Sequence, residues 1–388
     1  MSPPDTLLAA LAARTLEMHA QTRAWVEVNS FTENIAGVNA VGALLRQAFD
    51  LPSLATRVVP SERFGEHLVF ATAAATRVGA RPILLVGHHD TVFPPGHFEG
   101  WREEAGRAIG PGVLDMKGGL AIIRAVLATL DAAGALADLP IIVVSVGDEE
   151  VGSPDSAPHL RALAKDAACA LVFESGRVAD AIVTRRRGTG AITAVAEGRA
   201  AHAGNNHKDG ANAIWALTRF IDRAQRLTDY TRGITVNVGT IRGGTSKNTV
   251  PARAECMADL RCESLADGDT LVAVLAAAAA EAAAEVPGTS ITLTGGVNRA
   301  PLERTAASGA LFDEVAACQR AAGLGHAESP LVGGGSDANT IGALGVPCID
   351  GLGPRGMGFH TTTEYVELAS FAPKAESLLR FLWARRGA

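Results

Sequence analysis

The stretch ILLVGHHDTVFPPG, residues 83–96, joins an apolar run to a polar end. The run Ile83–Val86 is typical of a buried strand, and it breaks at Gly87 into two histidines and an aspartate. Because side chains alternate between the faces of an extended strand, His88 and Asp90 point one way and His89 the other. A lone histidine at a loop mouth is usually a packed one, but a histidine with a carboxylate beside it is also typical of metal sites.

Composition narrows the class of protein. The chain has 388 residues, 47% hydrophobic and 20% charged, which is enough for a sizeable core. Its formal charge is −6, so nothing favours nucleic acid as a partner. No apolar run reaches membrane-spanning length, and the five cysteines are scattered without a CxxC pair. We therefore expect a soluble, cytoplasmic protein with no nucleic-acid or membrane partner.

The two ends of the chain alternate strands with helices. Unbroken apolar runs predict strands at 83–86, 140–146 and 170–173, with a helix over 117–133 between the first two. The alternation resumes near the C-terminus with a strand at 346–349 and a final helix. This order is typical of an α/β domain built on a parallel sheet.

The middle of the chain shows another pattern. Strands and helices follow in the order strand, helix, strand, strand, helix, strand, at 191–197, 211–227, 234–238, 253–261, 265–285 and 291–293. This is the order of the ferredoxin-like split motif. We therefore assign residues 187–297 to an inserted ferredoxin-like α+β domain, and residues 1–186 with 298–388 to one discontinuous α/β domain.

Four further stretches carry acids or histidine where a predicted element begins or ends. Asp115 precedes a helix, Glu149 and Glu150 follow a strand, Glu174 closes another, and His360 follows a glycine-rich loop. Singly, Asp115 could be a helix cap and the paired glutamates a solvated loop. Ligands of open α/β sheets bind beyond the carboxyl ends of the strands, so one site could collect all of these groups. Converging carboxylates repel without cations, and the set suits zinc, with manganese or cobalt as alternatives.

At this point the chain resembles the M20 metallopeptidases, the family of glutamate carboxypeptidases, aminoacylases and related deacylases. The resemblance covers nearly the whole chain and rests on motifs in the family's order. These are HHDT (88–91), GPGVLDMKGG (110–119), DEEVGS (148–153), FES (173–175), AAHAG (200–204), SKNTVPARAECMADLR (246–261), GGGSDA (333–338) and the late His360. The resemblance implies a zinc-peptidase-type α/β catalytic domain, with the inserted domain serving as lid and dimerisation domain.

The family's roles carry over residue by residue. Asp115 would bridge two zinc ions, with His88 and Glu174 completing one site and Glu150 and His360 the other. Glu149 would be the general base. Asp90 would orient the His88 ring without binding metal, which leaves His89 a packing role.

Substrate residues are also implied by the resemblance. His202 would reach the active site of the opposite subunit, which implies a homodimer formed through the inserted domain. Arg261 would grip the substrate's free carboxylate, although it could also do no more than pair with Asp259 or Glu255. Asn248 would help to hold the substrate, and Gly334 and Gly335 would allow close approach of the backbone. The run Arg185–Arg187 is interpreted as a solvated face, with a second anion contact as the alternative.

The sequence therefore predicts a dinuclear zinc hydrolase that cleaves the amide bond of a peptidyl or N-acyl amino acid. The leading interpretation is a carboxypeptidase, of glutamate type by analogy with the family. The alternatives are an N-acyl amino acid deacylase or aminoacylase and, in another class, a non-catalytic metal-containing binding protein. A serine hydrolase using Ser336 is disfavoured because GGGSD lacks the G-x-S-x-G elbow.

Overall fold

The computed structural model describes residues 2–386, which form two compact units. Within these residues the first unit combines 2–185, 304–331 and 336–386, and the second combines 186–303 and 332–335. The first unit is therefore discontinuous in sequence. The second takes in residues 298–303 and the short segment 332–335, which the sequence analysis assigned to the α/β domain.

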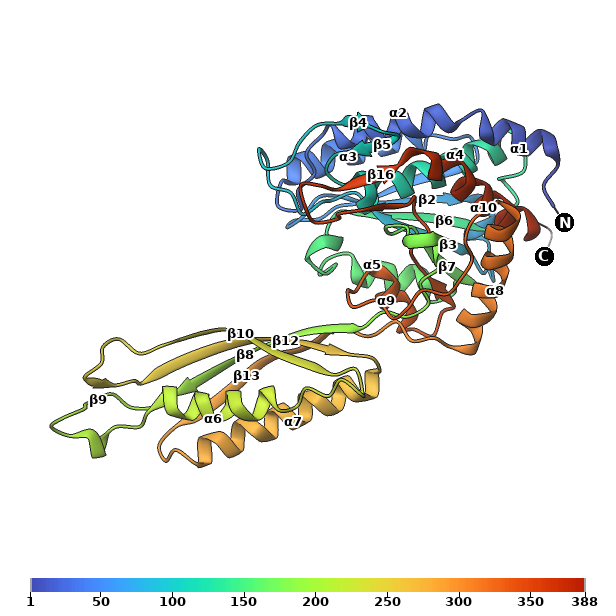
Figure 1. Ribbon diagram of the computed structural model, residues 1–388. Coiled ribbons are helices and arrows are strands. Elements are labelled where there is room, and N and C mark those ends of the chain that lie inside the picture. The colour runs from blue at the N-terminus through green and yellow to red at the C-terminus, as the bar shows by residue number, and fades with distance from the viewer. Residues whose placement is uncertain (1, 387–388) are drawn as a thin grey trace. The chain divides into compact units, whose positions relative to one another are not determined.

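A six-stranded sheet in the order β1-β2-β6-β3-β7-β14 forms the centre of the first unit (Figure 1). The strands are β1 (Leu54–Val59), β2 (His67–Thr72), β3 (Ile83–His88), β6 (Ile141–Val146), β7 (Cys169–Val172) and β14 (Cys348–Ile349). Neighbouring strands from β6 to β14 are parallel, whereas β1, β2 and β6 pair antiparallel. The expected all-parallel sheet is thus a mixed one. Its two antiparallel partners, β1 and β2, lie before the first strand that the sequence predicts.

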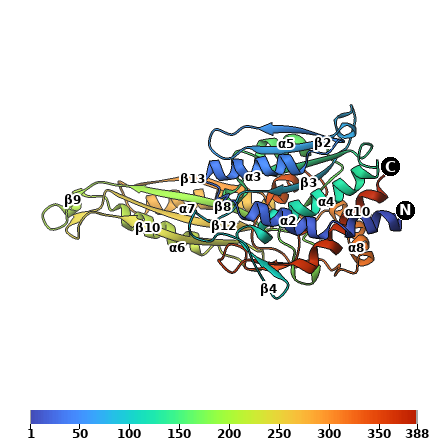
Figure 2. The same ribbon diagram turned by 90° about the horizontal axis from the view of Figure 1, so that it is seen from above.

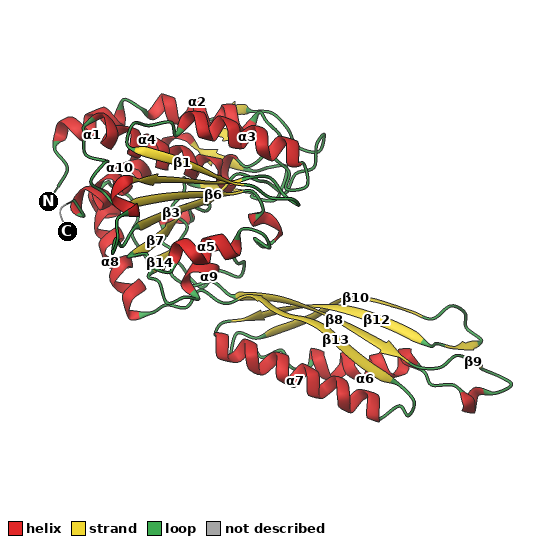
Figure 3. Ribbon diagram, turned by 180° about the vertical axis from the view of Figure 1, so that it is seen from behind, coloured by secondary structure: helices red, strands yellow, loops and turns green. Residues whose placement is uncertain are grey.

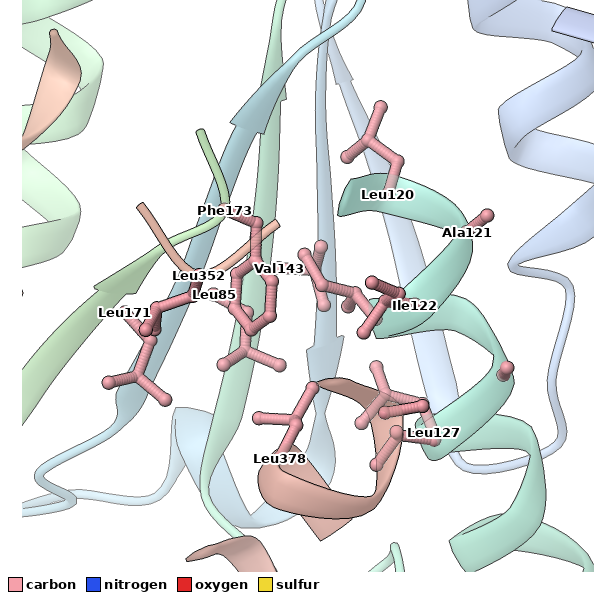
Figure 4. Packing of buried hydrophobic residues seen from close by; sticks show 14 of the residues in the cluster. Leu85, Leu120, Ala121, Ile122, Leu127, Val143, Leu171, Phe173, Leu352 and Leu378 are labelled. Carbon is pink, nitrogen blue, oxygen red and sulfur yellow. The ribbon is translucent and has the colours of Figure 1, made fainter. Parts of the chain in front are cut away.

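Helices cover both faces of this sheet. Those of the first unit are α1 (Asp5–Ala12), α2 (Thr15–Val26), α3 (Ile35–Ala48), α4 (Gly118–Ala132), α5 (Ala157–Ala164), α8 (Ala306–Ala321), α9 (Asp337–Gly342) and α10 (Phe371–Ala384). Figures 1 and 2 show α2, α4 and α10 together on one face and α5 on the other. Leu85 and Val143 from the strands pack against Ile122 and Leu127 of α4 and against Leu378 of α10 (Figure 4). Burial of this apolar layer holds the strand ends in fixed register.

A second, small sheet in the order β15-β16-β5-β4 completes the first unit. Its strands are β4 (Arg102–Glu104), β5 (Arg107–Ile109), β15 (Gly356–Met357) and β16 (Tyr365–Glu367). It joins a segment that precedes α4 to one that follows α9. This pairing brings β16, which follows His360, next to β5, in the segment that leads into Asp115, while β15 from the glycine-rich stretch before His360 pairs with the other edge of β16.

The second unit is a four-stranded antiparallel sheet with two helices on one face (Figure 3). Its elements are β8 (Gly188–Glu197), β9 (Ala201–His202), α6 (Ala213–Gln225), β10 (Thr235–Gly243), β11 (Thr249–Val250), β12 (Arg253–Cys262), α7 (Leu265–Ala284) and β13 (Ser290–Arg299). The spatial order β10-β12-β8-β13 is that of a ferredoxin-like fold. Alternate residues of β12, from Ala254 to Cys262, are buried against α6 and α7, as the period of two in this stretch predicts.

Candidate active site

Three neighbouring parallel strands end at one edge of the central sheet. His88 is the last residue of β3, Glu149 and Glu150 follow β6, and Glu174 follows β7. His88 lies opposite Val146 of β6 in the ladder, so β3 and β6 end level with each other. Because parallel strands direct their carboxyl ends to the same edge, the residues that follow them converge there.

Asp115 lies between the two histidines. Its Oδ1 is 3.4 Å from Nε2 of His88, and its Oδ2 is 3.3 Å from Nε2 of His360. Each carboxylate oxygen thus faces a different imidazole. Around them gather three glutamates, and we call the whole set the histidine–acid cluster: His88, Asp115, Glu149, Glu150, Glu174 and His360.

The glutamates divide between the two histidines. Oε2 of Glu174 is 3.7 Å from Nε2 of His88, and Oε2 of Glu150 is 3.0 Å from Nε2 of His360. Ligand atoms of His88, Glu149 and Glu174 lie within 4.8 Å of one another, as do those of His88, Asp115 and Glu150. The structure therefore brings together all five side chains that the sequence analysis assigned to metal, and the assigned base with them.

The electrostatics of the cluster fit divalent metal ions. Nε2 of His88 and Oδ1 of Asp115 are buried and have no hydrogen-bond partner. Burial, with a further contribution from the Asp115 carboxylate, raises the pKa of Glu150 to about 8 and the pKa of Glu174 well above its usual value. Buried acids this close repel one another when charged. A cation between them would restore their ionisation and use the orphaned atoms as ligands.

Asp90 links the His88 ring to the loop that carries the two glutamates. Its Oδ1 lies 3.3 Å from Nδ1 of His88. The backbone N–H groups of Glu149 and Glu150 donate to Oδ1 and Oδ2 at 3.2 Å, and the Thr32 hydroxyl donates to Oδ2 at 2.8 Å. Nδ1 of His88 also lies 3.1 Å from the Asp90 backbone carbonyl, so Asp90 orients the ring through its main chain as well as its buried carboxylate, and the carboxylate also fixes the turn after β6.

His89 takes no part in the cluster. Its Nδ1 lies 2.9 Å from the Ser145 hydroxyl on β6, and the residue is fully buried. Burial lowers the pKa of His89 to about 3, so the ring is neutral at neutral pH. These contacts agree with the packing role expected for this side chain.

Glu364 was not singled out by the sequence analysis. Its carboxylate accepts hydrogen bonds from the backbone N–H groups of Gly112, Leu114 and Asp115 at 2.8–3.1 Å. It therefore shapes the turn that presents Asp115, whose peptide bond to Met116 is cis. Its place four residues after His360 is the signal in the sequence that could have drawn attention to it.

The turn after β6 has a second support that the sequence reasoning missed. Nδ1 of the buried His67 accepts the N–H of Gly147 at 3.1 Å, and its Nε2 lies 3.1 Å from Asp155. The Asp148 carboxylate accepts the N–H groups of Asp155 and Ser156. His67 comes from β2, one of the strands that the sequence did not predict, so no local pattern pointed to it.

His202 and Asn248 lie beside each other on the second unit. His202 of β9 pairs with Thr249 of β11, and the N–H of Ala203 donates to the Asn248 carbonyl at 2.9 Å. His202 is exposed, and its Nδ1 accepts two local backbone N–H groups at 3.1 Å.

Arg261 and the glycine loop also belong to the second unit. Arg261 donates to both carboxylate oxygens of Asp259 at 2.8 and 2.9 Å, the pairing that the sequence analysis kept as its alternative. Gly334 is exposed, Gly335 is half-buried, and the Gly334 carbonyl accepts from the Arg186 guanidinium at 3.0 Å. Arg186 is buried, so the interpretation of Arg185–Arg187 as a solvated face is wrong for its middle residue.

The family profile of "Peptidase family M20/M25/M40" matches residues 84–384. The chain belongs to this family. The match includes every member of the histidine–acid cluster, and it starts at β3. As a family member the protein is a hydrolase of amide bonds, and the family's use of divalent metal agrees with the groups gathered at the sheet edge.

Relatives within the family include peptidases and deacylases. Carboxypeptidase G2 of Pseudomonas sp. (strain RS-16) is 29% identical over 89% of this chain and 83% of its own length. A succinyl-diaminopimelate desuccinylase of Caulobacter vibrioides is 28% identical over 90% of this chain and 92% of its own. Among solved structures, a tripeptidase from Staphylococcus aureus shares the fold with a TM-score of 0.77 at 23% identity, covering 95% of this chain and 97% of that one.

No helix within residues 2–386 is both long and apolar enough to cross a membrane.

Proposed function

We propose that this M20 protein is a dinuclear zinc carboxypeptidase that hydrolyses a peptidyl or N-acyl amino acid with a free carboxylate. The observation that carries the proposal is the position of Asp115. Its two oxygens face His88 and His360 at 3.4 and 3.3 Å, as a bridging carboxylate between two metal sites requires. His88 and Glu174 would complete one site, and Glu150 and His360 the other.

Bound zinc would supply a polarised substrate carbonyl and a water whose pKa falls toward ~7. Glu149 takes the proton of the attacking water and returns it to the leaving nitrogen. It can do so because its neighbour Glu150 contacts His360, so one glutamate of the pair binds metal while the other handles the proton. Asp90 holds the His88 ring and, through two backbone N–H groups, the turn that carries Glu149.

Substrate recognition is assigned to the second unit. Arg261 grips the free carboxylate, because a guanidinium matches that anion with two parallel hydrogen bonds. In the structure it makes this kind of bond to Asp259, so substrate binding exchanges one carboxylate for another. Asn248 holds the substrate, and Gly334 and Gly335 let its backbone come close.

His202 acts on a second copy of the chain. Its ring is exposed, and its Nδ1 is engaged by backbone N–H groups, so Nε2 is the atom it offers. We propose a homodimer formed through the second domain, in which Nε2 of His202 steadies the oxyanion of the partner's reaction.

We also propose a cytoplasmic location for the protein. This proposal rests on its scattered free cysteines.

A deacylase is the second candidate. The relatives named above include a desuccinylase as well as a carboxypeptidase, and the same metal chemistry serves both. The two differ in which side of the amide bond the pocket recognises.

Amino-acid release by zinc-loaded protein tests the proposal. Each N-acyl or dipeptide substrate is offered with a free α-carboxylate and again as its amide. We expect strong preference for the free acid, with the preference lost in Arg261→Ala. We expect Glu149→Gln to lose turnover by about 10²–10⁴-fold while zinc content stays unchanged, because the base is removed and the ligands remain.

Equal cleavage of acid and amide would instead support a general amidase and remove Arg261 from its role. Turnover unchanged in Glu149→Gln would remove the base. Release governed by the acyl group, whatever the leaving amino acid, would favour the deacylase.

A further inference from the structure

The residue that follows β6 has a backbone N–H that the sheet itself does not satisfy. The ladder between β2 and β6 ends with Leu68 opposite Ser145, and the ladder between β3 and β6 ends with His88 opposite Val146. Gly147 comes after both of these pairs, and it is buried. A buried N–H without an acceptor destabilises the chain, so a side chain must take the place of the missing strand partner.

The imidazole of His67 supplies this acceptor. Its Nδ1 lies 3.1 Å from the Gly147 nitrogen, and the residue is 1% exposed. Because a backbone N–H can only donate, Nδ1 carries no proton, and the proton of the neutral ring is on Nε2. Oδ1 of Asp148 lies 3.9 Å from Nδ1, which is too far for a hydrogen bond. The contact with Gly147 therefore requires one particular tautomer of His67.

Asp155 selects that tautomer. Its Oδ2 lies 3.1 Å from Nε2 of His67, so the Nε2–H has a carboxylate to which it can donate. Hydrogen bonds from the Ser61 hydroxyl and from the His67 ring hold the pKa of Asp155 below its usual value, which keeps the carboxylate ionised and able to accept. The hydrogen bond at one ring nitrogen sets the role of the other.

The bond from Gly147 to His67 fixes the start of the turn that carries Glu149. The turn is closed by the Ser153 N–H, which donates to the Asp148 carbonyl at 2.9 Å. Its start is packed tightly, since a Cβ on Gly147 would lie 2.9 Å from Cγ1 of Val38. The direction in which the chain leaves β6 therefore depends on His67, and Glu149 follows only two residues later.

We propose that His67 is a positioning residue for the general base, and that it acts only as the Nε2–H tautomer that Asp155 selects. The proposal rests on the proposed function, because it takes Glu149 to be the base. His67 acts through the Gly147 N–H and not through contact with the reacting atoms. A displacement of about 1 Å in a group that handles a proton can cost about 10²-fold in rate, so a small shift of the turn is enough to matter.

Two substitutions separate the roles of the ring nitrogens. In His67→Asn the amide oxygen is attached to Cγ, as Nδ1 is, so it can accept the Gly147 N–H. In His67→Gln the amide lies one bond further out, near the place of Nε2, so it can donate to Asp155 but leaves the Gly147 N–H without its acceptor. We expect His67→Gln to lower kcat by about 10–100-fold with KM within about twofold, and His67→Asn to retain kcat within about threefold.

The matched control is His159→Asn. His159 is an exposed histidine whose ring centroid lies 6.2 Å from that of His67, and its substitution should leave kcat and KM unchanged. Zinc content should stay at the wild-type level in all three variants, because every proposed metal ligand is still present. Tm of each variant reports the stability of the fold separately from turnover.

Nitrogen NMR of metal-free protein labelled with ¹⁵N-histidine measures the tautomer directly, without any turnover. The His67 signals are those that disappear in His67→Asn. We expect a protonated Nε2 and an unprotonated Nδ1 in the wild type, and a lower population of this form in Asp155→Ala. With zinc loaded, Asp155→Ala should lose less kcat than His67→Gln, because the Gly147 N–H keeps its acceptor.

Equal kcat in His67→Asn and His67→Gln would overturn the proposal, as would a protonated Nδ1 in the wild type. A loss of kcat in His67→Gln that comes with lost zinc or with a proportional rise in KM would also overturn it. These outcomes leave the proposed function in place, because the wild type still releases amino acid. If the wild type releases none, or if Glu149→Gln keeps full turnover, the proposed function fails and the role of His67 falls with it.

Discussion

Two groups of charged side chains lie in the first unit, and they are balanced in different ways. In the histidine–acid cluster, four carboxylates meet two imidazoles. In the other, which we call the Asp180 cluster, Asp180 and Glu367 meet Arg355 and Lys374. Arg355 donates to Asp180 at 2.7 Å and to Glu367 at 3.1 Å, and the Lys374 ammonium lies 3.7 Å from Asp180.

The difference separates a ligand site from a structural one. In the Asp180 cluster two acidic and two basic side chains neutralise one another. Each charged group there has a partner of opposite charge within the protein. The histidine–acid cluster has an excess of negative charge that its own side chains do not neutralise. A bound cation would neutralise this excess negative charge. Acids that lie close together therefore indicate a metal site only when basic side chains of the protein do not balance their charge.

The largest loss of metal content and activity is expected on substitution of Asp115, which lies at the centre of the excess negative charge. Asp115→Asn removes the carboxylate shared by both histidines, so metal content should fall and amide hydrolysis should drop to below about one thousandth of wild type. Elemental analysis and amino-acid release measure the two quantities. Asp166→Asn, a change of an exposed acid, should leave both unchanged. Full metal content in Asp115→Asn would contradict a bridging role.

Removing the Asp90 carboxylate should reduce metal binding and activity less than removing the Asp115 carboxylate. Asp90→Asn leaves every proposed ligand in place but weakens the contact with Nδ1 of His88 and one backbone hydrogen bond, so we expect a 10–100-fold loss in metal affinity or turnover. Competition with a chromogenic chelator gives the affinity. Thr32→Val removes only the hydroxyl that donates to Asp90 and should have a smaller effect. Equal effects of the two variants would show that Asp90 acts as a hydrogen-bonded anchor and nothing more.

The smallest effect on activity is expected for the Asp180 cluster, where the change appears in stability alone. Burial lowers the pKa of Lys374 from 10.5 to about 8. Between these pH values the unfolded chain holds a proton that the folded chain has released, so the free energy of unfolding rises with pH. Relative to Lys374→Met, the wild type should gain up to about 3 kcal/mol between pH 8 and 10.5. Urea denaturation of both proteins across this pH range measures the free energy of unfolding. Parallel dependence of that free energy on pH in the two proteins would contradict the lowered pKa of Lys374.

The convergence of the histidine–acid cluster could be predicted because strand ends are visible in sequence. His88, Glu149 and Glu174 each come at or just after an apolar run, and parallel pairing brings such ends together whatever lies between them. The order of elements in the second domain was equally clear, because its strands alternate with a period of two.

What the sequence did not predict depends on contacts between distant segments. β1 (Leu54–Val59) is mostly exposed or half-exposed and pairs at the sheet's edge, so it lacks a buried-strand pattern. His67 and Glu364 support the site from far along the chain, which no local periodicity reports. Arg186 lies in a charge run, and its burial follows from contacts with distant segments, because its backbone pairs with Leu302 and Val332 and its guanidinium donates to the Gly334 carbonyl.

The discontinuity of the first domain sets an order for its biosynthesis. His360, Glu364 and α10 all come after the second domain, which occupies residues 186–303 apart from one short segment. On a ribosome adding about 5–20 residues per second, the second domain can therefore fold first. During this time the N-terminal part of the first domain cannot complete its fold. The face of α4 that Leu378 covers in the folded protein is still exposed to water. The nascent chain thus has its longest exposure to chaperones and to aggregation over the same interval in which the histidine–acid cluster is incomplete.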